Sequence, residues 1–186
     1  MAFGNPFTIY VLVEAIWLIL PAYASNGLTP LVGLKKKTHP IDMGRKFRRQ
    51  PLFGPGKTWE GLVFGTFIGG LIGLVEMLAY PSLPFSISPE PLNIVPMSPL
   101  LGLLLGFGAM LGDIGGSFIK RQLKIPRGKP APILDQEDFL IGAFLFSLLL
   151  LAPEIEWVIL LAVITPVLHI TANVIGYLLK IKKQPW

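Results

Sequence analysis

The chain of 186 residues is 52% apolar, contains no cysteine and carries a formal net charge of +5. Its mean hydropathy of +0.63 and charged fraction of 15% exclude an ordinary soluble domain, in which about 25% of residues are charged. The lack of cysteine excludes disulfides and thiolate-bound metal clusters. Composition therefore predicts a helical membrane protein that crosses the bilayer several times.

Five apolar stretches follow one another along the chain. A helix needs roughly 20 apolar residues to cross a bilayer, and all but the fourth stretch come near that length. The fourth is shorter, and we expect it to extend toward Ile155. The sequence thus predicts one all-α membrane domain over residues 1–186, with five transmembrane helices at about 7–24, 59–80, 97–119, 138–155 and 157–179.

The basic residues fall into alternate connections between these stretches. Eight lie between residues 35 and 57, five between 120 and 129, and three in the tail after residue 179. Because Lys and Arg are enriched in cytoplasmic loops, the N-terminus is expected outside and the C-terminus in the cytoplasm. The cytoplasmic loops would cover about 35–57 and 120–137. This topology and contacts with anionic lipid heads account for the basic charge without a nucleic-acid partner.

The first stretch contains Pro21 and the run Ala22-Tyr23-Ala24, which is similar to a signal-peptide cleavage site. A signal peptide begins with basic residues, and none precedes Lys35. We therefore expect a retained helix that bends near Pro21. Asn26, at the inner end of this helix, is a candidate for binding a ligand or for capping a turn.

The second stretch begins after the loop Phe53-Gly54-Pro55-Gly56-Lys57-Thr58. Gly-Lys-Thr is part of a P-loop motif, but the first glycine of that motif would fall on Pro51 and no strand precedes it. Glycines, a lysine and helix N-terminal amides still favour anion binding by Lys57 and Thr58. Glycines then recur every four residues at 61–73, and again at 108–116 in the third stretch, which predicts close packing of the two helices.

The third stretch places one acid, Asp113, in an apolar setting. Such a carboxylate costs several kcal/mol unless it is paired or binds a cation. Asp135 and Asp138 follow on the same side of the membrane, and three carboxylates without cysteine favour a hard cation such as Mg²⁺. The alternatives are an ion pair of Asp113 with Lys120 or with a neighbouring helix, and N-capping by Asp135 or Asp138.

Basic and hydroxyl side chains share the helical stripe of Asp113, because residues three and four apart lie on one face. They are Ser117, Lys120, Arg121 and Lys124. Lysine and arginine here suit phosphate groups whose charge a metal also neutralises. Other polar residues are expected to be structural, including Glu14, Glu76 and interhelical hydrogen bonds from His169, Thr171 and Asn173. The proline-rich outer loop at 81–99 is assigned no chemistry.

Two separated motifs resemble those of phosphatidate cytidylyltransferases. Residues 54–61 resemble the Pro-x-Lys-Thr-Trp-Glu-Gly segment of that family, and residues 112–121 with 133–138 resemble its signature. The chain departs from the signature at Pro130-Ala131-Pro132, which replaces His-Gly-Gly, and at Gln136, which replaces arginine. The short chain, the five spans and the runs at 21–26 and 42–47 are instead similar to the archaeal branch, the CDP-archaeol synthases.

The resemblance implies transfer of CMP from CTP to digeranylgeranylglyceryl phosphate, with Mg²⁺, at the cytoplasmic face of the cell membrane. We expect catalysis by Asp113, Lys120 and Asp135, and Mg²⁺ ligation by Asp113, Asp135 and Asp138. The expected substrate-binding residues are Lys57, Thr58, Ser117, Arg121, Asn26 and Lys124. The alternatives are the same reaction on phosphatidate, an ion or anion transporter, and a scaffold that binds anionic lipids. The oligomeric state stays open.

Overall fold

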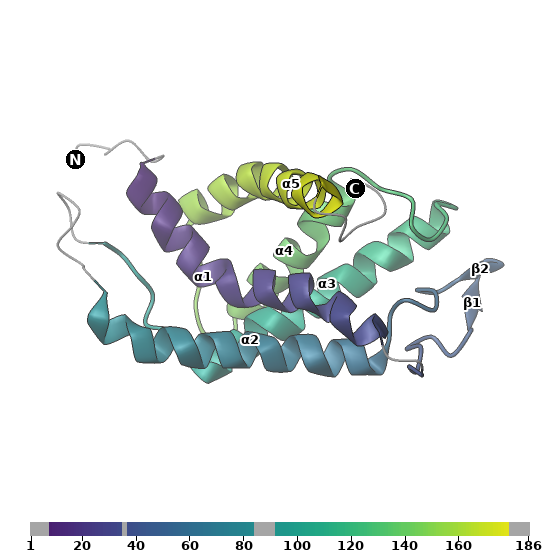
Figure 1. Cartoon of the computed structure of the whole chain (residues 1–186), viewed down its shortest axis with the longest axis horizontal. Helices are drawn as coiled ribbons and strands as arrows, with labels where there is room; N and C mark the ends of the chain where they lie inside the picture. Colours follow the sequence, from purple (N-terminus) through teal and green to yellow (C-terminus); the bar gives the residue numbers. More distant parts are fainter. Residues whose placement is uncertain (1–7, 35–36, 84–91, 179–186) are drawn as a thin grey trace.

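The computed structural model describes residues 8–34, 37–83 and 92–178 (Figure 1). Five helices make up most of these ranges, which confirms the predicted all-α fold. They are α1 (Ile9–Leu28), α2 (Trp59–Ala79), α3 (Pro99–Gln122), α4 (Leu134–Ser147) and α5 (Ile155–Leu178). Short 3-10 helices, η1 (Thr29–Leu34) and η2 (Tyr80–Ser82), follow α1 and α2. Between η1 and α2, strands β1 (Lys46–Phe47) and β2 (Gln50–Pro51) pair as an antiparallel hairpin.

Three helical segments are long and apolar enough to cross a membrane, namely Ile9–Val32, Trp59–Ser82 and Pro99–Gln122. Helix α5 contains a shorter apolar stretch, Ile155–Thr171, and α4 has only 14 residues. Helix α4 starts at Leu134 rather than near 138, and it ends at Ser147 instead of continuing to Ile155. Because a residue before proline disfavours helical geometry, Pro153 prevents continuous helix from α4 into α5.

Side-chain caps fix where several of the helices begin. The hydroxyl oxygen of Thr58 accepts a hydrogen bond from the Gly61 N–H at 3.1 Å, and that of Ser98 accepts one from the Leu101 N–H at 3.1 Å. Each satisfies one of the backbone donors that a helix leaves free in its first turn. Helix α1 passes Pro21, changes direction along its length and continues to Leu28 (Figure 1).

The predicted close packing of the second and third helices is confirmed, because glycines bring the backbones of α2 and α3 into contact. A Cβ atom on Gly69 would lie 2.5 Å from the Gly102 carbonyl oxygen, and one on Gly73 would lie 2.9 Å from the Gly102 Cα. Side chains therefore have no room at this crossing. The contact brings the start of α2 beside the end of α3.

The opposite face of α3 packs against α4 in the same way. A Cβ atom on Gly108 would collide with the Gly142 carbonyl oxygen, and one on Gly112 with the Asp138 carbonyl oxygen. Helix α3 is thus held by backbone contact on both sides. This second contact fixes the start of α4, which carries Asp135 and Asp138, against the end of α3.

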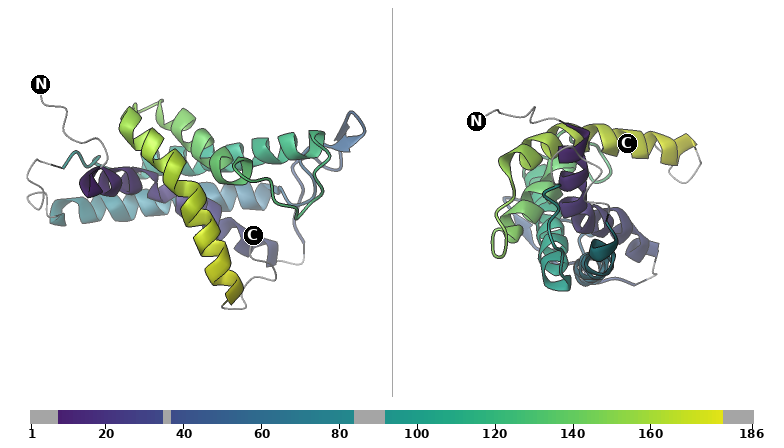
Figure 2. Two further views of the ribbon diagram at one scale, coloured as in Figure 1. Left: turned by 90° about the horizontal axis from the view of Figure 1, so that it is seen from above. Right: turned by 90° about the vertical axis from the view of Figure 1, so that its left-hand side faces the viewer.

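Large side chains and single hydrogen bonds hold α1 and α5 at the other end of the bundle. The Glu14 carboxylate of α1 accepts the Asn93 N–H at 2.6 Å and the Trp157 Nε1–H at 3.2 Å. Trp17 of α1 donates its Nε1–H to the Val95 carbonyl oxygen at 3.0 Å. Figure 2 shows α5 running obliquely across the other helices. Glu14 is therefore structural, as expected.

Helix α5 does not carry all of the hydrogen bonds between helices that were predicted for it. The Thr171 hydroxyl donates to the Val167 carbonyl oxygen at 2.8 Å, so this bond lies within α5 and the prediction for Thr171 is wrong. A threonine hydroxyl reaches the carbonyl one turn earlier without leaving its own helix. The Asn173 side chain lies outside the described residues, as do Lys35, Lys36, the tail lysines and residues 84–91 of the proline-rich loop.

Candidate active site

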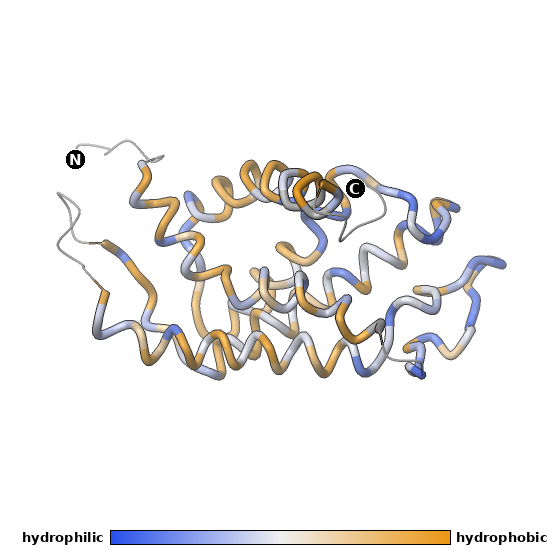
Figure 3. Tube along the Cα trace, in the orientation of Figure 1, coloured by the Kyte–Doolittle hydropathy of each residue, from blue (hydrophilic) through white to orange (hydrophobic). Residues whose placement is uncertain are grey.

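Hydrophilic residues gather at one end of the bundle, around the start of α2, the end of α3 and the hairpin (Figure 3). Two cavities open there. The first, of about 400 Å³, lies between α1, α2 and α3 and has polar groups from Asn26, Thr29, Thr58 and Asp113 against an apolar wall. The second, of about 280 Å³, is lined by Ser117, Lys120 and Arg121 of α3 and by Phe53. Gly56, Lys57 and Arg127 line both cavities.

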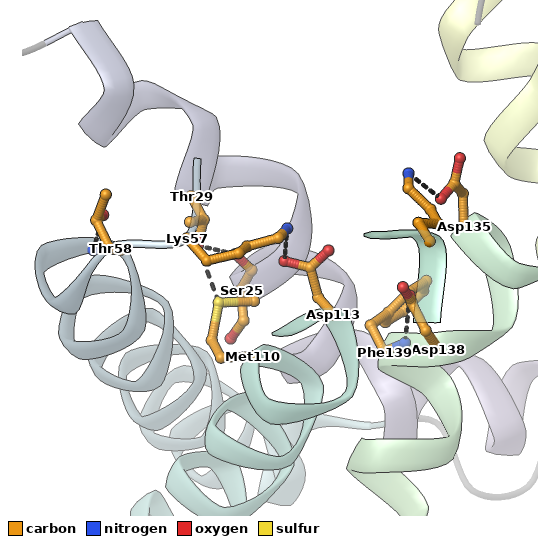
Figure 4. Close-up of polar contacts among 11 residues, drawn as sticks. Ser25, Thr29, Lys57, Thr58, Met110, Asp113, Asp135, Asp138 and Phe139 are labelled. Carbon is orange, nitrogen blue, oxygen red and sulfur yellow. Dashed lines mark hydrogen bonds and ion pairs between the residues drawn. The ribbon is translucent and has the colours of Figure 1, made fainter. Parts of the chain in front are cut away.

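Lys57, the residue before the α2 N-cap, forms an ion pair with Asp113, the first residue of the polar stripe on α3 (Figure 4). Their side chains keep 22% and 27% of their surface exposed, so the pair faces a cavity and is not sealed in the core. Of the predicted alternatives, the pair between Asp113 and Lys120 does not form, whereas an ion pair to a residue at the start of a neighbouring helix does. Glycine contacts between α2 and α3 bring Lys57 close instead.

A short backbone ladder holds Lys57 in place. The Ile41 N–H donates to the Lys57 carbonyl oxygen at 2.8 Å, and the Trp59 N–H donates to the His39 carbonyl oxygen at 3.0 Å. The Glu60 carboxylate closes the ladder, because it accepts the His39 N–H at 3.0 Å and contacts the His39 Nδ1 at 2.5 Å. The loop before α2 is therefore built as an ordered segment that presents its lysine to α3.

Asp42 fixes the turn that leads to Lys57. Its carboxylate is 4% exposed and accepts backbone N–H groups from Gly44 at 3.0 Å, Phe53 at 3.1 Å and Gly54 at 2.8 Å. Burial alone would raise the pKa of Asp42, but the three N–H donors outweigh it and the pKa lies below its usual value. Gly54 has a φ of +87°, a conformation that glycine adopts without strain.

A second ion pair joins the end of α3 to the start of α4. Lys120 Nζ lies 2.6 Å from an Asp135 carboxylate oxygen, and the other oxygen accepts the Ala131 N–H at 2.8 Å. Asp135 sits in the first turn of α4, where the helix dipole favours negative charge. It therefore closes the turn into α4 and also holds the lysine at the edge of the second cavity.

Asp138 lies deeper than the other two carboxylates. It is 9% exposed, and one of its oxygens would overlap any Cβ atom added to Gly116 of α3. The other oxygen accepts the Phe139 N–H at 2.6 Å. Asp138 is within electrostatic reach of Asp113 and Asp135, but it does not line either cavity. A glycine on α3 thus makes room for this buried acid.

The three predicted carboxylates do not form a ready-made metal cage. Among residues 8–34, 37–83 and 92–178, no three His, Asp or Glu side chains are close enough to hold a metal ion by themselves. Asp113 and Asp135 each contact a lysine instead. Mg²⁺ is commonly held by one or two carboxylates together with substrate phosphates. Two carboxylates that each contact a lysine, beside open cavities, have the composition of a site of that kind.

The other predicted residues divide between the cavities. Ser117 is buried beside the second cavity, and the Arg121 Nε–H is buried without a hydrogen-bond partner among the described residues. Asn26 lines the first cavity. Lys124 is exposed beyond the end of α3 with a φ of +60°, and the structure brings it to neither cavity. The helical stripe predicted for Lys124 fails because α3 ends at Gln122.

Sequence reasoning missed several residues at this end of the bundle. Arg127 was counted only as part of the basic loop, and no spacing rule ties a loop residue to a cavity. Asp42 belongs to the run 42–47 noted for its resemblance, but its three backbone hydrogen bonds are visible only in the fold. Thr29 follows α1 and donates its hydroxyl to the Ser25 carbonyl oxygen at 2.6 Å.

Comparisons with known proteins extend over nearly the whole chain. Residues 8–186 match the family model described as CarS-like, CDP-archaeol synthase. The CDP-archaeol synthase of Pyrobaculum arsenaticum is 39% identical over 181 residues, which cover 96% of this chain and 99% of that protein. The CDP-archaeol synthase of Pyrococcus abyssi is 41% identical over 174 residues, which cover 93% of this chain and 97% of that protein.

A solved structure also resembles this one. It is described as an intramembrane enzyme for archaeal membrane lipid biosynthesis. The two structures agree with a TM-score of 0.71 at 36% sequence identity, over 87% of this chain and 93% of the other. The similarity therefore covers the fold as well as the sequence.

Proposed function

Because the chain belongs to the family of CDP-archaeol synthases, we infer that its two cavities bring CTP and a lipid phosphate together for reaction. The protein is an intramembrane, CTP-dependent nucleotidyltransferase of archaeal lipid biosynthesis. The observation that carries the assignment of the site is the placement of two lysine–carboxylate pairs, Lys57–Asp113 and Lys120–Asp135, beside two adjoining cavities.

We propose digeranylgeranylglyceryl phosphate as the acceptor, and CDP-archaeol in its unsaturated form as the product. An oxygen of the lipid phosphate attacks the α-phosphorus of CTP, and a new P–O bond forms. The bond between the α-phosphorus and the bridging oxygen breaks, and pyrophosphate leaves with the electron pair. The lipid phosphate is already an anion, so the reaction needs no nucleophile from the protein. The protein must align two anions and offset their repulsion.

The proposed roles follow from where the side chains lie. Lys57, Lys120 and Arg121 hold phosphate oxygens through charge-assisted hydrogen bonds. The Thr58 hydroxyl oxygen already accepts a hydrogen bond from Gly61, so its hydrogen is available to donate to a phosphate. Ser117 donates in the same way from the second cavity. We leave Lys124 out of this set, because it lines neither cavity.

Mg²⁺ is the proposed cofactor, with Asp113 and Asp135 as its protein ligands. When bound, the ion would neutralise phosphate charge and polarise the P–O bonds. The lysines that contact Asp113 and Asp135 would then be free to move to the phosphates. Asp138, the third ligand expected from the sequence, lies behind the pair and lines neither cavity, so we leave it out of the metal site.

We propose that five helices cross the membrane, with the N-terminus outside and the site at the cytoplasmic face. The described basic residues all lie in the segments 37–57 and 120–129, which also supply the basic residues that line the cavities, in agreement with the enrichment of Lys and Arg on the cytoplasmic side. Helix α4 rises only about 21 Å, so the non-helical residues up to 154 would complete its crossing. The isoprenoid chains would occupy the apolar space between helices, and Asn26 would bind polar groups in the first cavity.

The decisive experiment is an assay of the purified protein with CTP, Mg²⁺ and either digeranylgeranylglyceryl phosphate or phosphatidate, following pyrophosphate and CDP-lipid. We expect turnover with the isoprenoid lipid and little with phosphatidate. Equal turnover with phosphatidate would contradict the proposed acceptor. Folded protein without product from either lipid, even with Mg²⁺ and CTP in excess, would contradict the assignment of the site.

A further inference from the structure

Arg127 stands in the wall between the two cavities. It belongs to the connection between α3 and α4, and it lines the first and the second cavity together with Gly56 and Lys57. Its tight turn is closed by the Lys129 N–H, which donates to the Pro126 carbonyl oxygen at 3.2 Å, and by Gly128 with a φ of +78°. Arg127, on the connection between α3 and α4, thereby reaches the loop before α2 that carries Lys57.

The guanidinium group of Arg127 packs against Gly56. A Cβ atom on Gly56 would stand 3.4 Å from both Nε and Nη2 and 3.6 Å from Cζ. A guanidinium carries five N–H donors. None of those of Arg127 donates a hydrogen bond to the residues that the structure describes, so they are available to a ligand in either cavity.

Arg127 also differs from its basic neighbours in charge balance. Lys57 and Lys120 each contact a carboxylate, whereas no ion pair forms at Arg127 among the residues that the structure describes. The side chain is exposed. An anion at the wall shared by the two cavities would therefore contact an arginine that is not paired with a carboxylate. The N–H donors of its planar, forked guanidinium group are available to that anion.

We propose that Arg127 is a further catalytic residue, which contacts the phosphoryl group while it passes from the nucleotide to the lipid phosphate. This inference rests on the proposed function, in which two anions react where their cavities meet. The α-phosphorus must then lie at the wall shared by Lys57 and Arg127. As the bond to pyrophosphate breaks and the bond to the lipid oxygen forms, charge on the phosphoryl oxygens is stabilised by the two N–H donors of the fork.

The test compares Arg127→Gln, Arg127→Lys and Lys129→Gln in the full-length protein, with kcat and KM measured for each substrate. Lys129 is exposed in the same loop and lines neither cavity, so Lys129→Gln is the matched control. We expect Arg127→Gln to lower kcat by about 10³-fold, as arginines at transferring phosphoryl groups do. Arg127→Lys keeps the charge without the fork and should fall between Arg127→Gln and the wild type.

Chemical rescue separates a direct contact from a structural role. Guanidinium ion should restore part of kcat to Arg127→Ala but not to a variant with a folding defect, and potassium chloride at equal ionic strength should not. A kcat of Arg127→Gln equal to that of the wild type would overturn the inference. So would a change confined to the KM of one substrate, because Arg127 would then serve one cavity alone. An inactive wild type would overturn the proposed function, and this inference with it.

Discussion

Two carboxylates in the helices, Asp113 and Glu14, are held in different ways at opposite ends of the bundle. Glu14 is buried and accepts two neutral donors, the Asn93 N–H and the Trp157 indole, at the junction of α1 and α5. Asp113 keeps a quarter of its surface exposed and contacts a charged lysine beside a cavity. Both satisfy the requirement that an acid in an apolar setting be paired.

The difference shows what distinguishes a structural acid from one suited to chemistry. The two neutral donors to Glu14 cannot leave it to bind a substrate, because the segments that carry them pack around the carboxylate. The partner of Asp113 is Lys57, which lies in the hydrogen-bonded loop before α2 and lines both cavities. Its side chain can move to an anion while the helices stay packed. The partner and the adjoining space therefore separate the two acids in the same sense as their burial does.

Among the changes at these two ends, the largest effect should come from removing the carboxylates proposed to bind Mg²⁺. Asp113→Asn and Asp135→Asn keep the shape of the side chain but lose its charge, and we expect each to lower kcat by at least about 10²-fold. Thermal unfolding in detergent should show that both variants stay folded. Near-normal turnover in both variants would contradict the distinction between Glu14 as a structural acid and Asp113 as an acid suited to chemistry.

The second prediction concerns the glycine that makes room for Asp138. Gly116→Ala places a methyl group on the Asp138 carboxylate, and displacement of a group by about 1 Å can cost 10²-fold in rate. Gly115→Ala is the matched control, because nothing lies within 4 Å of a Cβ atom at Gly115. Equal kcat values for the two variants would mean that the position of Asp138 does not matter to turnover.

A smaller effect is expected from Asp42, which acts on the reaction only through the lysine loop. Asp42→Asn loses charge-assisted hydrogen bonds to backbone N–H groups, and the loosened turn should raise the KM for CTP by roughly tenfold. Restoration of the wild-type KM is not expected from added Mg²⁺. An unchanged KM together with a lower unfolding temperature would limit Asp42 to stability.

The smallest effect on turnover is expected at Glu14. Glu14→Gln leaves one buried donor without an acceptor, which should cost about 1–3 kcal/mol of stability. The unfolding temperature should fall, while kcat measured well below it should equal that of the wild type. A loss of kcat in folded Glu14→Gln protein would show that this distant acid is coupled to the reaction.

Much of this arrangement follows from the sequence, because membrane helices and small-residue packing leave regular patterns. The glycines at intervals of four predicted the contact of α2 with α3 and, through it, the approach of Lys57 to Asp113. The contact of α3 with α4 was missed, because Gly142 stands alone in its helix and its partner Gly108 was assigned to α2. The early start of α4 was missed as well, since loop residues before Asp135 carry no helical pattern.

The site residues also divide into those that regular spacing in the sequence predicted and those that it did not. Lys120, Ser117 and Arg121 could be placed from helical spacing, and the structure places all three at one cavity. Asp135 pairs with Lys120, which spacing did not reveal, because the contact crosses a loop. Arg127 and Asp42 lie in irregular backbone next to residues with positive φ. No periodic pattern in the sequence identifies such residues.

The hydrogen bond between Glu14 and Trp157 also has a consequence for biogenesis. The two residues are separated by 143 positions, on α1 and α5. Glu14 is therefore made long before its indole partner, and the acid must be sheltered in some other way until then. This junction can close only after α5 has been made, so it would report the arrival of that helix.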